Sequence, residues 1–140
     1  MRSLILTFLG LATTGLVAAQ DLKIEVISSV PCTRKTKNGD ILSVNYNGTL
    51  TNGTTFDSSY SANSSDPFSF TLGAGQVITG WDLGLLDMCI GDKRKLTLPP
   101  KFGYGDRAVG PIPPNSTLLF YTELMGMSIQ ATPRPNEVVN

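Results

Sequence analysis

The apolar residues of this chain recur mainly at every second position, and this spacing restricts the fold more than any other feature of the sequence. Successive side chains of a β-strand point to opposite faces, so the spacing predicts strands with one apolar face. Strands are expected at residues 22–26, 42–47, 54–56, 68–72, 93–98 and 118–127. Asn52 and Gly53 stand where a tight hairpin turn would join two of these strands. The pattern therefore indicates a mainly antiparallel sheet.

Only one segment has helical spacing. Trp81 and Leu85 are four residues apart and would share one face of a helix. Thr79 is the expected N-cap, with Asp82 as its acidic capping-box partner. The segment is short and contains Gly84, so tertiary packing must hold it. The expected fold class is α+β, an antiparallel sheet embracing one short helix.

Composition and charge exclude several classes of function. The 140 residues are 41% hydrophobic, which suits one packed domain. Eleven basic residues balance 11 acidic ones, so the chain is not a strongly basic partner of nucleic acid or of a membrane surface. The sequence has no histidine, which rules out Ser-His-Asp and Cys-His nucleophiles and His-bearing zinc sites. No motif indicates a metal or another cofactor.

The N-terminus resembles a secretory signal peptide. Arg2 precedes an apolar stretch at residues 4–17, and small residues follow at a plausible cleavage position. The alternative is a transmembrane helix, but the apolar run is short for a bilayer span. We expect a signal peptide at 1–19, a domain at 20–130, a flexible tail at 131–140 and no membrane insertion after cleavage. The last five residues are not a KDEL or HDEL signal, which favours secretion over receptor-driven retention. The expected location is the secretory pathway, either secreted or in the endoplasmic reticulum lumen.

Export changes how the cysteines and asparagines are interpreted. Cys32 and Cys89 are the only two cysteines, and an oxidising compartment favours a disulfide between them over two buried free thiols. Four Asn-Xaa-Ser/Thr sequons are candidate glycosylation sites. They begin at Asn47, Asn52, Asn63 and Asn115.

A set of large apolar and aromatic residues is the most informative feature for function. Its members are Tyr46, Phe56, Phe68, Val77, Ile78, Trp81, Tyr104 and Phe120. Most of them are also compatible with an ordinary β-protein core. Trp81, however, starts a short helix after glycine-rich turns, where it would form the floor of an open apolar pocket.

The chain resembles the FKBP family of peptidyl-prolyl cis-trans isomerases, the immunophilins that bind macrolides such as tacrolimus and rapamycin. The resemblance runs from about residue 22 to 129. It is carried, in order, by segments 44–48, 55–59, 67–70, 72–82, 91–95, 102–105 and 112–118. Each motif is weak alone, but together they are highly specific. The signal peptide, the cysteine pair and the spacing resemble the secretory branch of the family, in which this pair forms a disulfide.

The resemblance implies a twisted antiparallel sheet wrapped around one short helix, with a pocket between them. Trp81 would be the pocket floor beneath the substrate proline, and Asp57 an acceptor at the rim. The Ile78 N–H and the Tyr104 hydroxyl would hold the substrate backbone. The walls would be Tyr46, Phe56, Phe68, Val77 and Phe120, and the binding set would include Gln76 and Ile112.

The implied activity is isomerisation of X-Pro bonds in unfolded secretory proteins, without covalent catalysis. We expect a monomer, because no long unpaired hydrophobic stripe is evident in the sequence. The alternative is a peptide- or macrolide-binding chaperone or docking module with little activity. Two departures from some relatives are visible. Residues 60–63 supply no basic partner for Asp57, and residues 106–110 lack a histidine. The partner of Asp57 and the specificity of that loop therefore do not follow from the resemblance. The pocket that the resemblance implies would have Asn47 and Asn115 near its edge, where a glycan would shield it.

Overall fold

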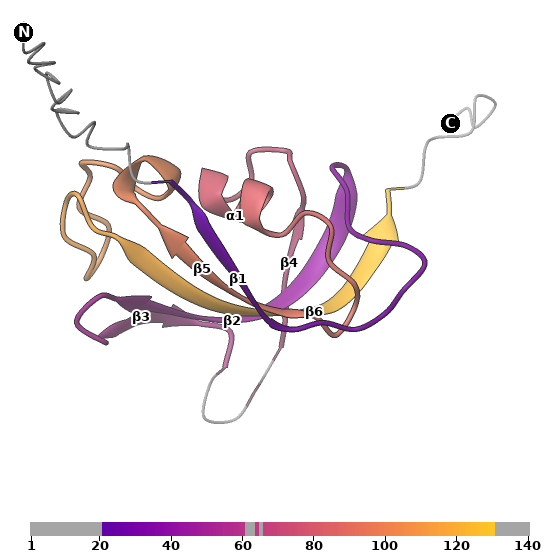
Figure 1. Cartoon of the computed structure of the whole chain (residues 1–140). Helices are drawn as coiled ribbons and strands as arrows, with labels where there is room; N and C mark the ends of the chain where they lie inside the picture. Colours follow the sequence, from indigo (N-terminus) through magenta and orange to yellow (C-terminus); the bar gives the residue numbers. More distant parts are fainter. Residues whose placement is uncertain (1–20, 61–63, 65, 131–140) are drawn as a thin grey trace, which may run out of the picture.

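Strands form a single antiparallel sheet in the computed structural model, which describes residues 21–60, 64 and 66–130. One short helix, α1 (Thr79–Gly84), lies against one side of this sheet (Figure 1). The strands are β1 (Lys23–Ser28), β2 (Asp40–Leu50), β3 (Thr55–Ser58), β4 (Phe68–Thr71), β5 (Lys93–Leu98) and β6 (Leu118–Ile129). A 3₁₀ turn, η1 (Pro100–Phe102), follows β5. The predicted α+β fold class is confirmed.

Strand β2 organises the sheet, whose order is β1-β5-β6-β2-β3. On one side β2 pairs with β6 from Asp40 to Leu50. On its other side two short strands share the edge, with β4 pairing residues 41–44 and β3 pairing residues 47–49. The alternation of β2 and β6 therefore decides which side chains face α1 and which face away from it.

The helix lies close to β5 because two of its residues are glycines. A Cβ atom on Gly84 would lie 2.8 Å from Leu96 Cδ1, and one on Gly80 would collide with Leu98. The glycine that weakens the helix in isolation is therefore required by its packing. The expected N-cap is wrong: Ile78 is the N-cap, Thr79 is the first helical residue, and no side chain caps the helix. Asp82 instead bonds to the preceding loop.

The core lies between α1 and the sheet face that the helix covers. It is built from Leu42, Val44, Phe70, Leu72, Trp81, Leu85, Met88, Leu96, Leu98, Ile112, Leu118, Phe120 and Leu124. Strand β1 departs from the expected pattern of a buried apolar face. Ile24 and Val26 remain 43% and 61% exposed. An edge strand is paired on one side only, and the helix is too short to cover it.

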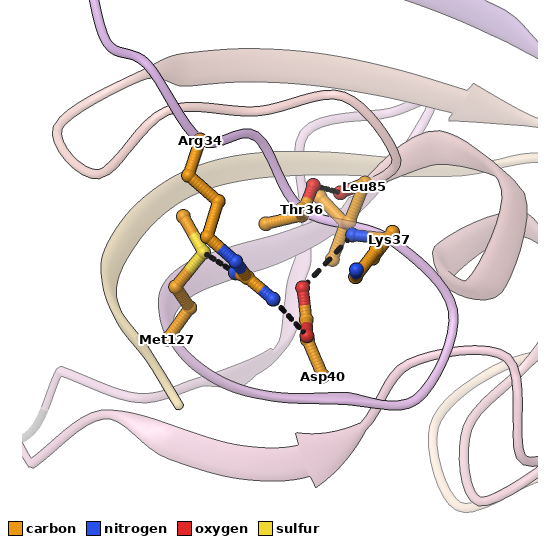
Figure 2. A network of polar contacts seen from close by, with 6 residues as sticks. All are labelled: Arg34, Thr36, Lys37, Asp40, Leu85 and Met127. Atoms are coloured by element: carbon orange, nitrogen blue, oxygen red, sulfur yellow. Dashed lines mark hydrogen bonds and ion pairs between the residues drawn. The ribbon is translucent and has the colours of Figure 1, made fainter. Parts of the chain in front are cut away.

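The segment between β1 and β2 is fastened to the rest of the domain by covalent and polar contacts. Cys32 forms the expected disulfide with Cys89, with a Cα–Cα distance of 5.8 Å. Figure 2 shows the polar contacts, in which Arg34 Nη2 donates to Asp40 Oδ1 at 2.7 Å. Thr36 Oγ1 donates to the Leu85 carbonyl at 2.6 Å. The disulfide and the Thr36 bond fix the segment against the C-terminal end of α1, and the Arg34 bond fixes it to the start of β2.

Three sequence-based expectations concern residues outside the described ranges. The signal peptide at 1–19 and the tail at 131–140 lie there, as does Asn63. Where the chain is described, no helix is long and apolar enough to cross a membrane.

Candidate active site

A cavity of about 420 Å³ opens between α1 and the sheet. Strands β2, β3, β4 and β6 and helix α1 contribute to it, together with the loop before α1 and the turn after η1. Its lining residues are Tyr46, Phe56, Asp57, Phe68, Gln76, Val77, Ile78, Trp81, Tyr104 and Phe120. All ten belong to the set expected from the sequence. The fold therefore brings together side chains that are up to 74 positions apart in the chain, from 46 to 120.

Trp81 is the centre of the aromatic lining and is only 4% exposed. Its ring lies 4.9 Å from that of Tyr46 and 5.3 Å from that of Phe120, both nearly perpendicular to it. Phe68 also meets it edge-on, at 6.1 Å. Edge-to-face contacts place the positive ring edges against negative ring faces, which favours this geometry over flat stacking. The result is a rigid apolar floor with aromatic walls.

The single carboxylate of the lining, Asp57, is held by its neighbours. Tyr46 donates its hydroxyl proton to Asp57 Oδ2 at 2.7 Å, and the Ser58 N–H donates to Asp57 Oδ1 at 2.9 Å. Tyr46 thus supplies the partner that residues 60–63 do not offer. Burial, followed by the hydrogen bond to Asp57, raises the pKa of the Tyr46 hydroxyl far above its ordinary value. Tyr46 therefore remains a protonated donor at neutral pH.

The cavity also presents donors without acceptors. Among the described residues, neither the Ile78 N–H nor the Tyr104 hydroxyl meets an acceptor. Burial, followed by the charge of Asp57, raises the pKa of Tyr104, so this group keeps its proton as well. The buried Trp81 Nε1 is also unpaired within the described part of the chain. Of these donors only Trp81 Nε1 is buried, where an unpaired group is costly. Ile78 and Tyr104 are half-buried at the cavity, so their donors are accessible to a ligand with acceptor oxygens.

The loop before α1 is held in place by side chains whose role the sequence did not reveal. Asp82 accepts hydrogen bonds from the Gly73 and Gly75 N–H groups at 2.8 and 3.2 Å. Gln76 Oε1 accepts from the Thr71 N–H at 2.9 Å. Together these bonds position the loop that carries Val77 and Ile78. The sequence shows an acidic residue in the first helical turn and predicts a capping partner, whereas Asp82 binds the loop instead.

Three residues expected at or near the pocket lie elsewhere. Ile112 is 4% exposed and packs in the core, where its backbone pairs with Val109 instead of lining the cavity. Asn47 alternates with Tyr46 on β2 and lines a groove on the opposite face of the sheet. Asn115 lines a third groove, shared with Asn52. A glycan on either asparagine would therefore not shield the cavity in the expected way.

Known proteins similar to this chain agree with the geometry. A family model described as FKBP-type peptidyl-prolyl cis-trans isomerase matches residues 32–125. FK506-binding protein 2 of Podospora anserina is 57% identical over 96% of this chain and 71% of its own length. FK506-binding protein 2 of Emericella nidulans is 52% identical over 94% of this chain and 95% of its own length. The corresponding protein of Aspergillus fumigatus is 55% identical over 89% and 92%.

Proposed function

Because the chain belongs to the family of FKBP-type peptidyl-prolyl cis-trans isomerases and is an isomerase of this type, we propose that its aromatic cavity is the site at which X-Pro bonds isomerise. The observation that carries this assignment is a buried tryptophan floor combined with two donors that meet no acceptor among the described residues. A proline ring fits an apolar floor, and the carbonyls that flank it need donors. The cavity provides both.

Each lining group has a distinct role in this proposal. Trp81 lies beneath the proline ring, while Phe68 and Phe120 enclose its sides. The Ile78 N–H and the Tyr104 hydroxyl donate to substrate carbonyls and hold the peptide on either side of the proline. Asp57, fixed by Tyr46, places a negative charge at the rim of the cavity.

The reaction needs no acid, base or nucleophile. Rotation about X-Pro breaks the partial double-bond character of the C–N bond, which accounts for a barrier of about 18–20 kcal/mol. Water stabilises the planar imide, because its carbonyl carries negative charge. An apolar cavity removes that water and favours the twisted, less dipolar state. The donors then keep the flanking chain in place while the bond rotates.

We propose that the substrates are proline-containing proteins that fold in the secretory pathway. The disulfide supports this location, because such bonds persist in oxidising compartments. The similar proteins are named FK506-binding protein 2, and members of the family bind macrolides such as FK506. We extend macrolide binding to this cavity. Uncatalysed X-Pro isomerisation takes tens to hundreds of seconds, slow enough to limit folding.

A coupled isomerisation assay on short X-Pro peptides tests the site, with rapamycin as the competing ligand. Tyr104→Phe removes one donor from the cavity and keeps the ring. Tyr121→Phe is the matched control, because Tyr121 is exposed on the opposite face of the sheet. Losing one neutral hydrogen bond should lower kcat/KM about two- to tenfold in Tyr104→Phe. Tyr121→Phe should leave it unchanged.

Rapamycin should abolish the acceleration in the wild type. Equal rates for the two tyrosine variants would remove Tyr104 from the site. Tight macrolide binding without any acceleration would instead indicate a binding module that uses the same cavity.

A further inference from the structure

Two identical Asn-Gly-Thr tripeptides occupy different structural environments in this domain. The first begins at Asn47, within the central strand β2, and the second at Asn52, at the tip of the hairpin between β2 and β3. Enzymes that attach N-linked glycans select this tripeptide pattern. The tripeptides are the same, so neither is the better acceptor by its own three residues, but their surroundings in the folded domain differ.

The hairpin-tip tripeptide is open to an enzyme in all three positions. Asn52, Gly53 and Thr54 are each exposed. Gly53 has a positive φ of 88°, which allows the chain to turn so that Asn52 Oδ1 accepts from the Thr54 N–H at 3.0 Å. This turn brings the side-chain amide of Asn52 close to the backbone of Thr54. Within the described ranges, the Asn52 side-chain nitrogen donates no hydrogen bond.

The strand tripeptide is closed by comparison. Asn47 pairs with both Ser58 of β3 and Tyr121 of β6, so the chain is extended there and cannot turn back on itself. Gly48 is buried, and a Cβ at that position would lie 2.7 Å from the ring of Phe56. No enzyme that needs a turned acceptor reaches this site in the folded sheet.

The third described sequon lies between these extremes. Asn115 is exposed, but Ser116 and Thr117 are half-buried. The Ser116 hydroxyl donates to the Pro113 carbonyl at 2.6 Å, and the Asn115 N–H donates to the Gly105 carbonyl at 2.8 Å. Both bonds hold this loop in place. Of the three described sequons, the one at Asn52 alone has every position exposed.

We propose that Asn52 is an N-glycosylation site of the folded domain and that Asn47 is not. The inference depends on the proposed secretory location, where the co-substrate is a lipid-pyrophosphate-linked oligosaccharide. The Asn52 amide nitrogen bonds to the first sugar carbon and loses a proton. The bond from that carbon to the lipid pyrophosphate breaks, and the pyrophosphate leaves with the electron pair.

A glycan at Asn52 leaves the isomerase cavity open. Asn52 lies beside a groove lined by Thr51, Pro113 and Thr117, and it does not line the aromatic cavity. The hydroxyls of Thr51 and Thr117 offer partners to the first sugar. The glycan would therefore cover the hairpin tip and protect this part of the sheet edge, and it should not change the rate on short peptides.

The test is expression of the full chain in a eukaryotic host, with an additional acceptor sequon appended after Asn140 to report entry into the lumen. Peptide-N-glycosidase in ¹⁸O-labelled water converts each glycosylated asparagine to ¹⁸O-labelled aspartate. Mass spectrometry then identifies the position of each labelled aspartate. We expect the label at Asn52 and at the appended sequon, and none at Asn47. Asn52→Gln and Thr54→Ala should both remove the glycan, whereas the matched Asn47→Gln should retain it.

Label at Asn47, or an unmodified Asn52 in a chain whose appended sequon is modified, would overturn the proposal. If the appended sequon is also unmodified, the chain does not enter the lumen and the proposal fails with its premise. The isomerase assay on the same preparations separates this outcome from the proposed function. Wild type, Asn52→Gln and enzymatically deglycosylated protein should show the same kcat/KM on short peptides.

Discussion

The two ends of helix α1 are held in opposite ways. At its C-terminal end, Arg94 Nη1 donates to the carbonyls of Gly84 and Leu86, at 2.8 and 2.6 Å. Thr36 binds the Leu85 carbonyl there, and the disulfide lies one turn further on. At its N-terminal end the helix has no side-chain cap, and the Ile78 N–H meets no acceptor among the described residues.

This difference separates stability from recognition within a helix of six residues. A helix end leaves backbone groups without partners, and these are satisfied by side chains, by water or by a ligand. The C-terminal carbonyls are satisfied by the protein itself. The N-terminal end is left open toward the aromatic cavity. We therefore expect changes at the C-terminal end to alter the free energy of unfolding, and changes at the N-terminal end to alter catalysis.

Removing the disulfide should have the largest effect on stability. The bond joins cysteines 57 positions apart. Closing a loop of this size costs the unfolded chain about 4 kcal/mol of entropy in the simple closure model. Cys32→Ser combined with Cys89→Ser should lower the free energy of unfolding in urea by about that amount.

The same double variant should keep its kcat/KM under conditions in which it remains folded, because neither cysteine lines the cavity. A loss of activity in the folded double variant, without a matching loss of stability, would contradict the assignment of stability to the C-terminal end of α1 and of catalysis to its N-terminal end.

Acidification should weaken the network around Asp40. The hydrogen bond from Arg34 lowers the pKa of Asp40 below its ordinary value. A lowered pKa contributes stability that is present above the unfolded value of about 3.9 and is lost as pH falls through the folded value. Urea unfolding at a series of pH values should show a steeper acid loss in wild type than in Asp40→Asn. The loss in Asp40→Asn at neutral pH should be smaller than that from the disulfide.

The control for this series is Asp106→Asn, which changes an exposed carboxylate. Its unfolding curve should run parallel to that of the wild type at every pH. An Asp40→Asn curve that is also parallel to the wild type would show that the Arg34 contact does not stabilise the domain.

The smallest of these effects concerns the loop before the helix. Asp82→Ala removes the acceptor for the Gly73 and Gly75 N–H groups. The loop that carries Ile78 should then be less ordered, at a cost of about 1 kcal/mol, or about a fivefold rise in KM. The free energy of unfolding should change little, because this contact is exposed. An unchanged KM would mean that the loop is held by its other contacts.

The sequence predicted those parts of the fold in which one face is buried. Strands β2 and β6 follow their apolar alternation because α1 covers one side of them. The same alternation in β1 is misleading, since Val26 lies at a sheet edge and is 61% exposed in the described part of the chain. The position of Asn47 was predictable, because the period of two already places it on the opposite face from Tyr46.

Other features depend on contacts between distant segments. Nothing local shows that Asp82 reaches the Gly73 N–H instead of capping its own helix. Likewise, Ile112 enters the core because its backbone pairs with Val109 in a tight turn. The bond between Tyr46 and Asp57 requires the pairing of β2 with β3, so a motif comparison leaves the partner of Asp57 open.

The most direct test compares kcat/KM for X-Pro isomerisation in two variants of buried residues, Trp81→Leu and Leu85→Ala. Trp81 lies within α1 and lines the cavity, whereas Leu85 is the C-cap of the helix and does not. Both substitutions destabilise the core, so the rates are measured at a temperature at which near-ultraviolet circular dichroism shows both variants folded. We predict that kcat/KM falls by more than about tenfold in Trp81→Leu, a change of about 1.4 kcal/mol. Leu85→Ala should retain the wild-type value. Equal losses in the two variants would contradict the separation of catalysis from stability along this helix.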